Sequence, residues 1–102
     1  MSDTTQSSSH RGLVIELGGD IDLANAQSLG DALCDTSDRT HRDMVVDLSA
    51  VPFMDACGMG MLARVHAYAT RNGCVVTWRG IQPLPKRVVA LVGLDGILHF
   101  EP

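Results

Sequence analysis

An aspartate and a cysteine that could support chemistry stand two positions apart in the stretch FMDACGMG, residues 53–60. A short apolar run ends at Asp55, and small residues around Cys57 lead into a segment whose apolar residues recur at helical spacing. A thiol at a helix N-terminus lies near free N–H groups and the positive end of the helix dipole, which favour the thiolate. The carboxylate of Asp55 opposes that effect. Cys57 is therefore either a reactive thiol or a small packing residue at a tight corner.

A second aspartate, Asp22, also stands between a strand-like segment and a helical one. Such corners lie at the carboxyl edge of a parallel sheet, where α/β folds place their sites. Paired carboxylates can perform acid–base catalysis, but no histidine or lysine accompanies Asp22 and Asp55 in the sequence. We therefore expect the two aspartates to bind a partner or to cap helices, with Asp22 or Asn25 capping the first helix.

The cysteines and histidines form no pattern typical of a metal site. There are three cysteines without a CxxC pair and four histidines without ligand spacing: Cys34, Cys57, Cys74, His10, His41, His66 and His99. We expect no metal and no cofactor. Cys57 and Cys74 bracket a predicted helix roughly 20 Å long, which excludes a disulfide between them. Cys34 and Cys74 are expected at the same end of the domain, where a contact is conceivable, although free buried thiols are the simpler expectation.

The bulk composition is that of a single soluble domain. The chain has 102 residues, 45% of them hydrophobic, and a formal net charge of −4. An acidic domain without a basic cluster does not suit nucleic acid, which needs concentrated lysine and arginine. No apolar run approaches the roughly 20 residues of a membrane helix, and we find no secretory signal at the N-terminus. We expect a cytoplasmic protein that makes no direct contact with nucleic acid or membrane.

Apolar runs and amphipathic stretches alternate along the chain. Strands are predicted at residues 13–18, 44–51, 74–78 and 96–100, and helices at residues 20–35, 58–72 and 83–93. The last helix is expected to bury Leu84, Val88, Leu91 and Val92. Residues 35–43 are predicted to be a polar connection, and residues 1–11 a flexible tail before a domain at 12–102. This order predicts an α/β fold with a four- to five-stranded, largely parallel sheet packed against helices.

Four segments of the chain occur in an order and spacing typical of one known family. They are GGDIDLANAQSLGDAL, MVVDLSAVPFMDACGMGML, ATRNGCVVTWRG and VVALVGLDGIL, and the similarity extends over about residues 13–100. Each motif is weak alone, but together they resemble the STAS domain, specifically the stand-alone bacterial anti-sigma factor antagonists. The resemblance implies the STAS fold and a protein that works by binding and is not an enzyme.

The resemblance also implies a partner, an anti-sigma factor that acts as a serine kinase of the histidine-kinase-like ATPase type. Binding would release a sigma factor and so regulate transcription. In the family the kinase phosphorylates the second serine of a DSSG motif, and the added charge of about −1.5 to −2 breaks the complex. The implied partner-binding residues are Asp22, Asn25, Asp55, Ala56, Cys57, Gly58, Met59 and Gly60.

Glycine and methionine residues shape the centre of this implied interface. Gly58 and Gly60 are expected to permit close backbone approach at the first turn of the second helix. Met61 falls on the apolar stripe of that helix, whereas Met59 is expected to be exposed to a partner. Methionine adapts well to irregular interfaces because its side chain is unbranched and polarisable.

The phosphorylation motif is altered in this chain. It reads Asp55-Ala56-Cys57-Gly58, so that Cys57 stands at the phosphoacceptor position and Ala56 offers no hydroxyl beside it. The serine switch is therefore replaced by a phosphorylation-blind packing residue or by a redox-sensitive thiol, unless the sulfur or another residue is phosphorylated. Asp22 and Asp55 keep the residues of the family, so the binding surface is expected to remain.

Two other functions fit parts of the pattern. STAS subunits also bind the ATPase of phospholipid ABC transporters and carry a DTAG-like motif, to which DACG is similar. A thiol enzyme that uses Cys57 would need a base, and no histidine is near this cysteine in the sequence. Gene neighbourhood would distinguish a transporter subunit from a sigma-factor regulator.

Overall fold

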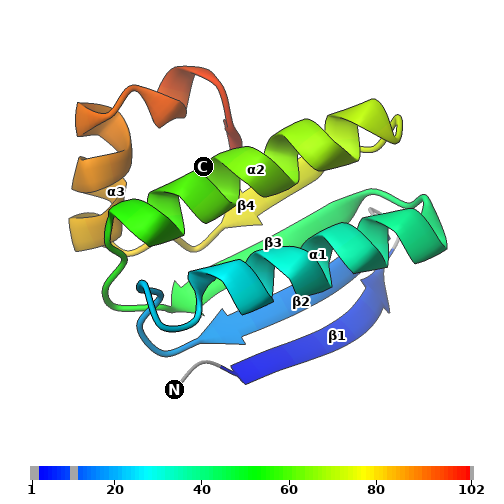
Figure 1. Cartoon of the computed structure of the whole chain (residues 1–102), viewed down its shortest axis with the longest axis horizontal. Helices are drawn as coiled ribbons and strands as arrows, with labels where there is room; N and C mark the ends of the chain where they lie inside the picture. Colours follow the sequence, from blue (N-terminus) through cyan, green and yellow to red (C-terminus); the bar gives the residue numbers. More distant parts are fainter. Residues whose placement is uncertain (1–2, 10–11, 102) are drawn as a thin grey trace.

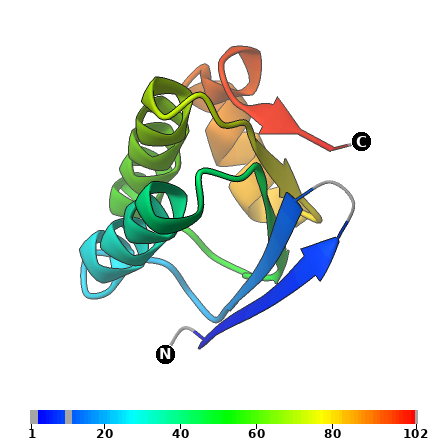
Figure 2. The same ribbon diagram turned by 90° about the vertical axis from the view of Figure 1, so that its right-hand side faces the viewer.

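Alternating apolar strands and amphipathic helices build one sheet with two long helices across one face (Figures 1 and 2). The computed structural model describes residues 3–9 and 12–101. The elements are β1 (Asp3–Ser9), β2 (Gly12–Gly18), α1 (Ala26–Thr40), β3 (Met44–Ala50), α2 (Ala56–Arg71), β4 (Val76–Arg79), α3 (Pro83–Leu91), the 3-10 turn η1 (Leu94–Gly96) and β5 (His99–Phe100).

The sheet has five strands in the order β1-β2-β3-β4-β5. β2, β3, β4 and β5 pair in parallel, whereas β1 pairs antiparallel with β2. Each parallel connection carries a helix or helical turns, as parallel pairing requires. The predicted α/β class and the largely parallel sheet are confirmed.

The segment expected to be a flexible tail contains a strand. Asp3–Ser9 lies along β2, with Cα partners running from Asp3 opposite Gly18 to Ser9 opposite Gly12. The free edge of β2 offers unpaired N–H and C=O groups, and a polar segment can satisfy them as an outer strand. The prediction missed this strand because it judged the segment by its lack of apolar residues. The remaining residues of the predicted tail, 1, 2, 10 and 11, lie outside the described part of the chain.

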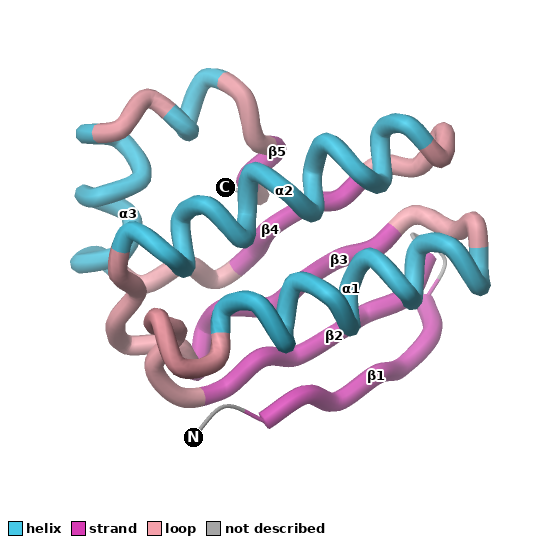
Figure 3. Tube along the Cα trace, viewed as in Figure 1, coloured by secondary structure: helices cyan, strands magenta, loops and turns pink. Residues whose placement is uncertain are grey.

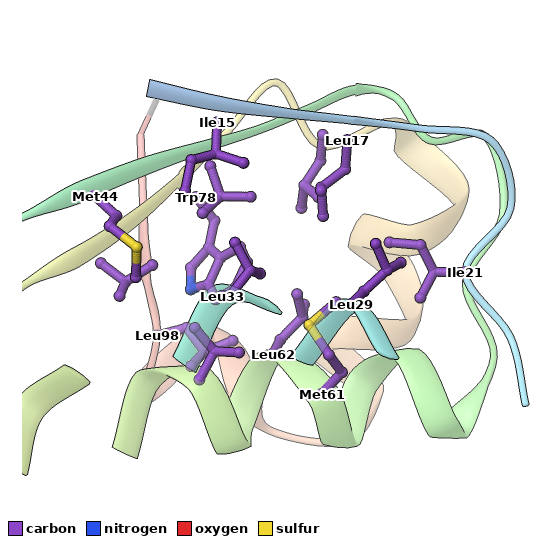
Figure 4. Packing of buried hydrophobic residues seen from close by; sticks show 14 of the residues in the cluster. Ile15, Leu17, Ile21, Leu29, Leu33, Met44, Met61, Leu62, Trp78 and Leu98 are labelled. Carbon is purple, nitrogen blue, oxygen red and sulfur yellow. The ribbon is translucent and has the colours of Figure 1, made fainter. Parts of the chain in front are cut away.

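The core lies between the sheet and the helices α1 and α2, which lie side by side on it (Figure 2). Figure 4 shows Trp78 of β4 and Ile15 of β2 packed toward Leu33 and Leu62 from the two helices. Trp78, Ile15 and Leu62 are fully buried. Complete burial of a large apolar side chain contributes about 1.5–3 kcal/mol to folding, so this layer anchors both helices to the strands.

Helix α1 begins and ends later than the predicted residues 20–35: it begins at Ala26, and the polar residues 36–40 continue it to Thr40. Contacts with the end of α2 hold them in place: the Tyr68 hydroxyl donates to Asp38 Oδ2 at 2.7 Å, and Asn72 Nδ2 donates to Ser37 Oγ at 3.1 Å. Polar composition suggested a connection, but these tertiary hydrogen bonds give the polar side chains partners within a helix.

Helix α3 begins at Pro83 as predicted, but its buried face is different. Pro85 and Val89 are buried, whereas Leu84 is 54% exposed and Leu91 is 84% exposed. The predicted core face is therefore wrong for Leu84, Leu91 and Val92, whereas Val88 does pack against the core with part of its surface exposed. The helix has apolar residues on two faces, so their spacing alone cannot decide which face turns inward.

Asp47 of β3 gives the fold a measurable pH dependence. Burial alone would raise its pKa, but hydrogen bonds from Ser49 and an ion pair with Arg79, at 3.0 Å, outweigh it and lower the pKa. A lowered folded-state pKa contributes stability above the unfolded value of about 3.9, and this stability is lost as the pH falls through the folded value.

Between about pH 5 and 3, the Asp47→Asn variant should therefore lose less unfolding free energy than the unmodified protein, as measured by urea denaturation at each pH. Parallel pH curves for the two proteins would contradict this.

Candidate partner-binding site

The two strand-to-helix corners predicted to form the site lie side by side. Ile21 and Met54 form a parallel bridge beyond the ends of β2 and β3. The Asp55 N–H donates to the Ile21 carbonyl at 3.1 Å, and the Ile21 N–H donates to the Phe53 carbonyl at 3.1 Å. Both loops appear at the same end of the sheet in Figure 3. The expectation that Asp22 and Asp55 share one edge is thus met.

Asp55 joins the two corners through its carboxylate. Oδ1 accepts the N–H groups of Cys57 at 2.8 Å and Gly58 at 3.1 Å, which caps α2. Oδ2 accepts the N–H of Leu23, at 3.2 Å, from the loop before α1. One side chain therefore satisfies free donors at a helix start and fixes a loop more than 30 residues away in the chain. Removing it would disturb the site as well as any direct contact with a partner.

Asp22 and Asn25 shape the loop before α1 and do not cap the helix with their side chains. Asn25 occupies the N-cap position without a side-chain cap bond. Its Oδ1 accepts the Asp22 N–H at 3.0 Å, and Asp22 Oδ1 accepts the Ala24 N–H at 3.0 Å. The predicted capping role is therefore wrong for both, since their oxygens are used within the loop that presents Leu23.

Two glycines of α2 differ in the space around them. A Cβ on Gly58 would lie 2.1 Å from Met54 Cγ and 3.1 Å from the Ile21 carbonyl oxygen, so the close approach predicted there is confirmed. A Cβ on Gly60 would meet nothing within 4 Å. Gly60 therefore leaves an open surface and is not required for internal packing.

The two methionines in the first half of α2 are both buried. Met61 is buried as predicted, and Met59 is also buried, at 4% exposure. The expectation that Met59 is exposed is wrong: its side chain is buried and lines a hollow between α2 and α3, together with Val88 and Leu94. Spacing along one helix could not reveal a hollow whose other wall is supplied by a later segment.

The exposed centre of the site is formed by Ala56, Cys57 and Gly60. Cys57 is an exposed free thiol, whereas Cys34 and Cys74 are buried free thiols. Leu23 projects beside them with 80% of its surface exposed. Sequence reasoning missed Leu23, although a leucine directly after Asp22 in a polar loop was an available signal.

Two apolar hollows flank the first two turns of α2. One, of about 300 Å³, lies between α1 and α2 and is lined by Leu23 and Cys57 among others. The other, of about 340 Å³, lies between α2 and α3 and is lined by Val88 and Val92 among others. Gly60 borders both. The arrangement suits the binding of apolar side chains from a protein, on either side of a small-residue helix turn.

A metal cluster and a membrane-spanning helix each place requirements on the described residues. Within residues 3–9 and 12–101, no group of three or more potential ligands is placed to hold a metal ion. In the same residues, no helix has the length and apolar character needed to span a bilayer.

The elements define a small α/β domain with an exposed corner at the start of α2. The family described as "Mlab, STAS domain" matches residues 4–99, and the chain belongs to the STAS domain family. The chain is 33% identical over 98 residues to "Anti-sigma-F factor antagonist RsfB" of Mycobacterium tuberculosis, and the alignment covers 92% of this chain and 77% of that protein.

Solved structures agree with this assignment. The crystal structure of an anti-sigma factor antagonist from Mycobacterium paratuberculosis has a TM-score of 0.81 and 27% identity, covering 100% of this chain and 86% of that one. An anti-sigma factor antagonist structure from Thermotoga maritima has a TM-score of 0.83 at 17% identity, covering 95% and 84%, and supports the fold alone.

Proposed function

We propose that this protein is an anti-sigma factor antagonist. It binds an anti-sigma factor of the histidine-kinase-like ATPase type, and this binding releases a sigma factor. The protein acts in the cytoplasm by protein–protein contact, with no enzymatic step and no contact with nucleic acid or membrane. The similarity to the mycobacterial antagonist over 92% of the chain is the observation that carries the proposal.

The binding face consists of Ala56, Cys57 and Gly60 at the start of α2, together with Leu23. Asp22, Asn25 and Asp55 hold its two segments in place through the hydrogen bonds of the corners. Small residues on a rigid helix turn, with an apolar hollow on each side, favour close contact with a protein surface.

Calorimetric titration against each switch kinase of the same genome tests the function. Saturable binding to one of them, with displacement of its sigma factor, is the expected result. Binding to none of the kinases, together with binding to the ATPase of a phospholipid ABC transporter, would replace the proposal with the transporter alternative.

We further propose that serine phosphorylation does not switch this site. Residue 57 is a cysteine and residue 56 an alanine, so the motif has no hydroxyl to accept phosphate. The exposed Cys57 thiol is instead open to exchange with glutathione disulfide. Exchange forms a disulfide between Cys57 and glutathione, releases one glutathione thiol and needs no further oxidant.

Glutathionylation of Cys57 should weaken binding at least about tenfold, because a tripeptide on the helix turn blocks the close contact. The modified protein is separated, verified by mass and titrated against the kinase by calorimetry. Cys57→Ser given the same treatment is the matched control, since Cys34 and Cys74 are buried. Failure of the thiol to react, or equal binding after modification, would leave Cys57 as a packing residue at a phosphorylation-blind site.

A further inference from the structure

A cavity of about 350 Å³ lies on the side of α3 away from α2. It is bounded by the chain after β4, by α3, by η1 and by the end of β5. The size falls within the range of roughly 300–1,000 Å³ that small-molecule sites occupy in proteins. It shares no lining residue with the hollows beside α2.

The floor of the cavity is apolar. Val89 of α3 is 2% exposed, and Ile81 and Phe100 are partly buried hydrophobic residues packed against the core. Pro85 and Val89 are the buried side chains of α3, and Val88 packs against the core with part of its surface exposed. A bound apolar group would therefore fill space beneath a helix that has few buried contacts of its own.

The rim of the cavity carries charges of both signs. Lys86 of α3 supplies an ammonium group, and Asp95 of η1 supplies a carboxylate. Across residues 3–9 and 12–101, neither side chain makes a hydrogen bond or an ion pair. Glu101 adds a second acidic group to the lining. A ligand that bears only a negative charge would face two acids, and a ligand that bears only a positive charge would face Lys86.

We propose that this cavity binds a free α-amino acid with a branched apolar side chain. The carboxylate of the ligand pairs with Lys86, and its ammonium group pairs with Asp95. The side chain lies on the floor formed by Val89, Ile81 and Phe100. Charged hydrogen bonds to the two groups on the α-carbon fix the orientation of the ligand at one end, and burial of the apolar side chain at the other end supplies affinity. This proposal is independent of the function assigned to α2.

The probe for the test is L-leucine, titrated into the ¹⁵N-labelled full chain and followed by NMR. Two truncated analogues separate its charges: 4-methylpentanoate lacks the ammonium group, and 3-methylbutylamine lacks the carboxylate. We expect saturable shifts of the Ile81, Val89 and Phe100 amides, with leucine binding at least about tenfold more tightly than either analogue.

Charge variants assign the two rim contacts. Lys86→Gln should weaken leucine binding about tenfold and strengthen the binding of 3-methylbutylamine, whose ammonium group no longer faces a like charge. Asp95→Asn should weaken leucine binding and strengthen the binding of 4-methylpentanoate for the corresponding reason. Arg87→Gln is the matched control, because Arg87 is the neighbouring exposed cation of α3 and does not line the cavity. Its leucine affinity should equal that of the unmodified protein.

Three results would overturn the proposal. The first is the absence of saturable shifts with leucine up to about 20 mM, a range that covers weak small-ligand affinities. The second is equal affinity for leucine and either analogue. The third is an equal loss of affinity in Lys86→Gln and Arg87→Gln. The ¹⁵N spectrum of each variant establishes that it is folded before titration.

Discussion

Gly60→Glu is expected to reduce binding of the anti-sigma factor at least about 100-fold while the domain stays folded. Gly60 lies at the centre of the proposed face and borders both hollows beside α2. A Cβ at this position meets nothing within 4 Å, so a side chain can be added without a clash at its base and would occupy the space between the two hollows. Burial of an unpaired carboxylate in an apolar contact is strongly unfavourable.

Ala67→Glu is the matched control for this substitution. Ala67 is exposed on the same helix, and the seven-residue step from Gly60 amounts to about 10 Å along nearly the same face. Its affinity, measured by calorimetry, should stay within about twofold of the unmodified protein. Gly60→Glu should also raise the unfolding free energy by about 0.5–1 kcal/mol, because glutamate favours helix more than glycine. Unchanged binding by Gly60→Glu would place the interface elsewhere on the domain.

Gly58→Ala should destabilise the domain by about 1–3 kcal/mol, because its new methyl group overlaps Met54 Cγ at 2.1 Å. The gain in helix propensity, about 1 kcal/mol at most, opposes this cost without removing it. Gly60→Ala, two positions further along the same helix, is the control and should stabilise the domain instead. Urea denaturation of the two variants measures these opposite signs.

A double-mutant cycle tests the cause of that effect. In a Met54→Ala background the clashing atom is gone, so Gly58→Ala should cost at least about 1 kcal/mol less than in the unmodified protein. If the two costs are equal, the clash with Met54 is not the source of the destabilisation. Such a result would leave the Ile21 carbonyl, 3.1 Å from the new methyl group, as the next contact to examine.

The parts of the fold that follow from local periodicity were predictable from the sequence. Strand β3 is apolar except for Asp47 and Ser49, and the stripe from Met61 to Ala69 marks the buried face of α2. The order of elements then limits the topology to a largely parallel sheet. The meeting of Asp22 and Asp55 at one edge follows from this topology, which is why the location of the site could be anticipated.

The errors occur where a distant segment decides the outcome. Met59 is buried and lines a hollow whose other wall comes from α3 and the turn after it, and β1 pairs with the free edge of β2. Residues 35–40 are helical because Tyr68 and Asn72 hydrogen bond with them. The two oxygens of Asp55 bind donors from different loops, which its local spacing cannot indicate. Each of these structural features depends on contacts between residues that are far apart in the chain, which local sequence patterns do not indicate.

Helix α3 is a wall common to two spaces, since Lys86 and Val89 line the cavity while Val88 and Val92 line the hollow beside α2. An occupant of either space would contact the same helix, so α3 is the element through which the two binding events would be coupled. Thermodynamic reciprocity then requires that any factor by which a cavity ligand changes partner affinity equals the factor by which the partner changes ligand affinity. The antagonist would thereby respond to a metabolite concentration without any covalent change at residue 57.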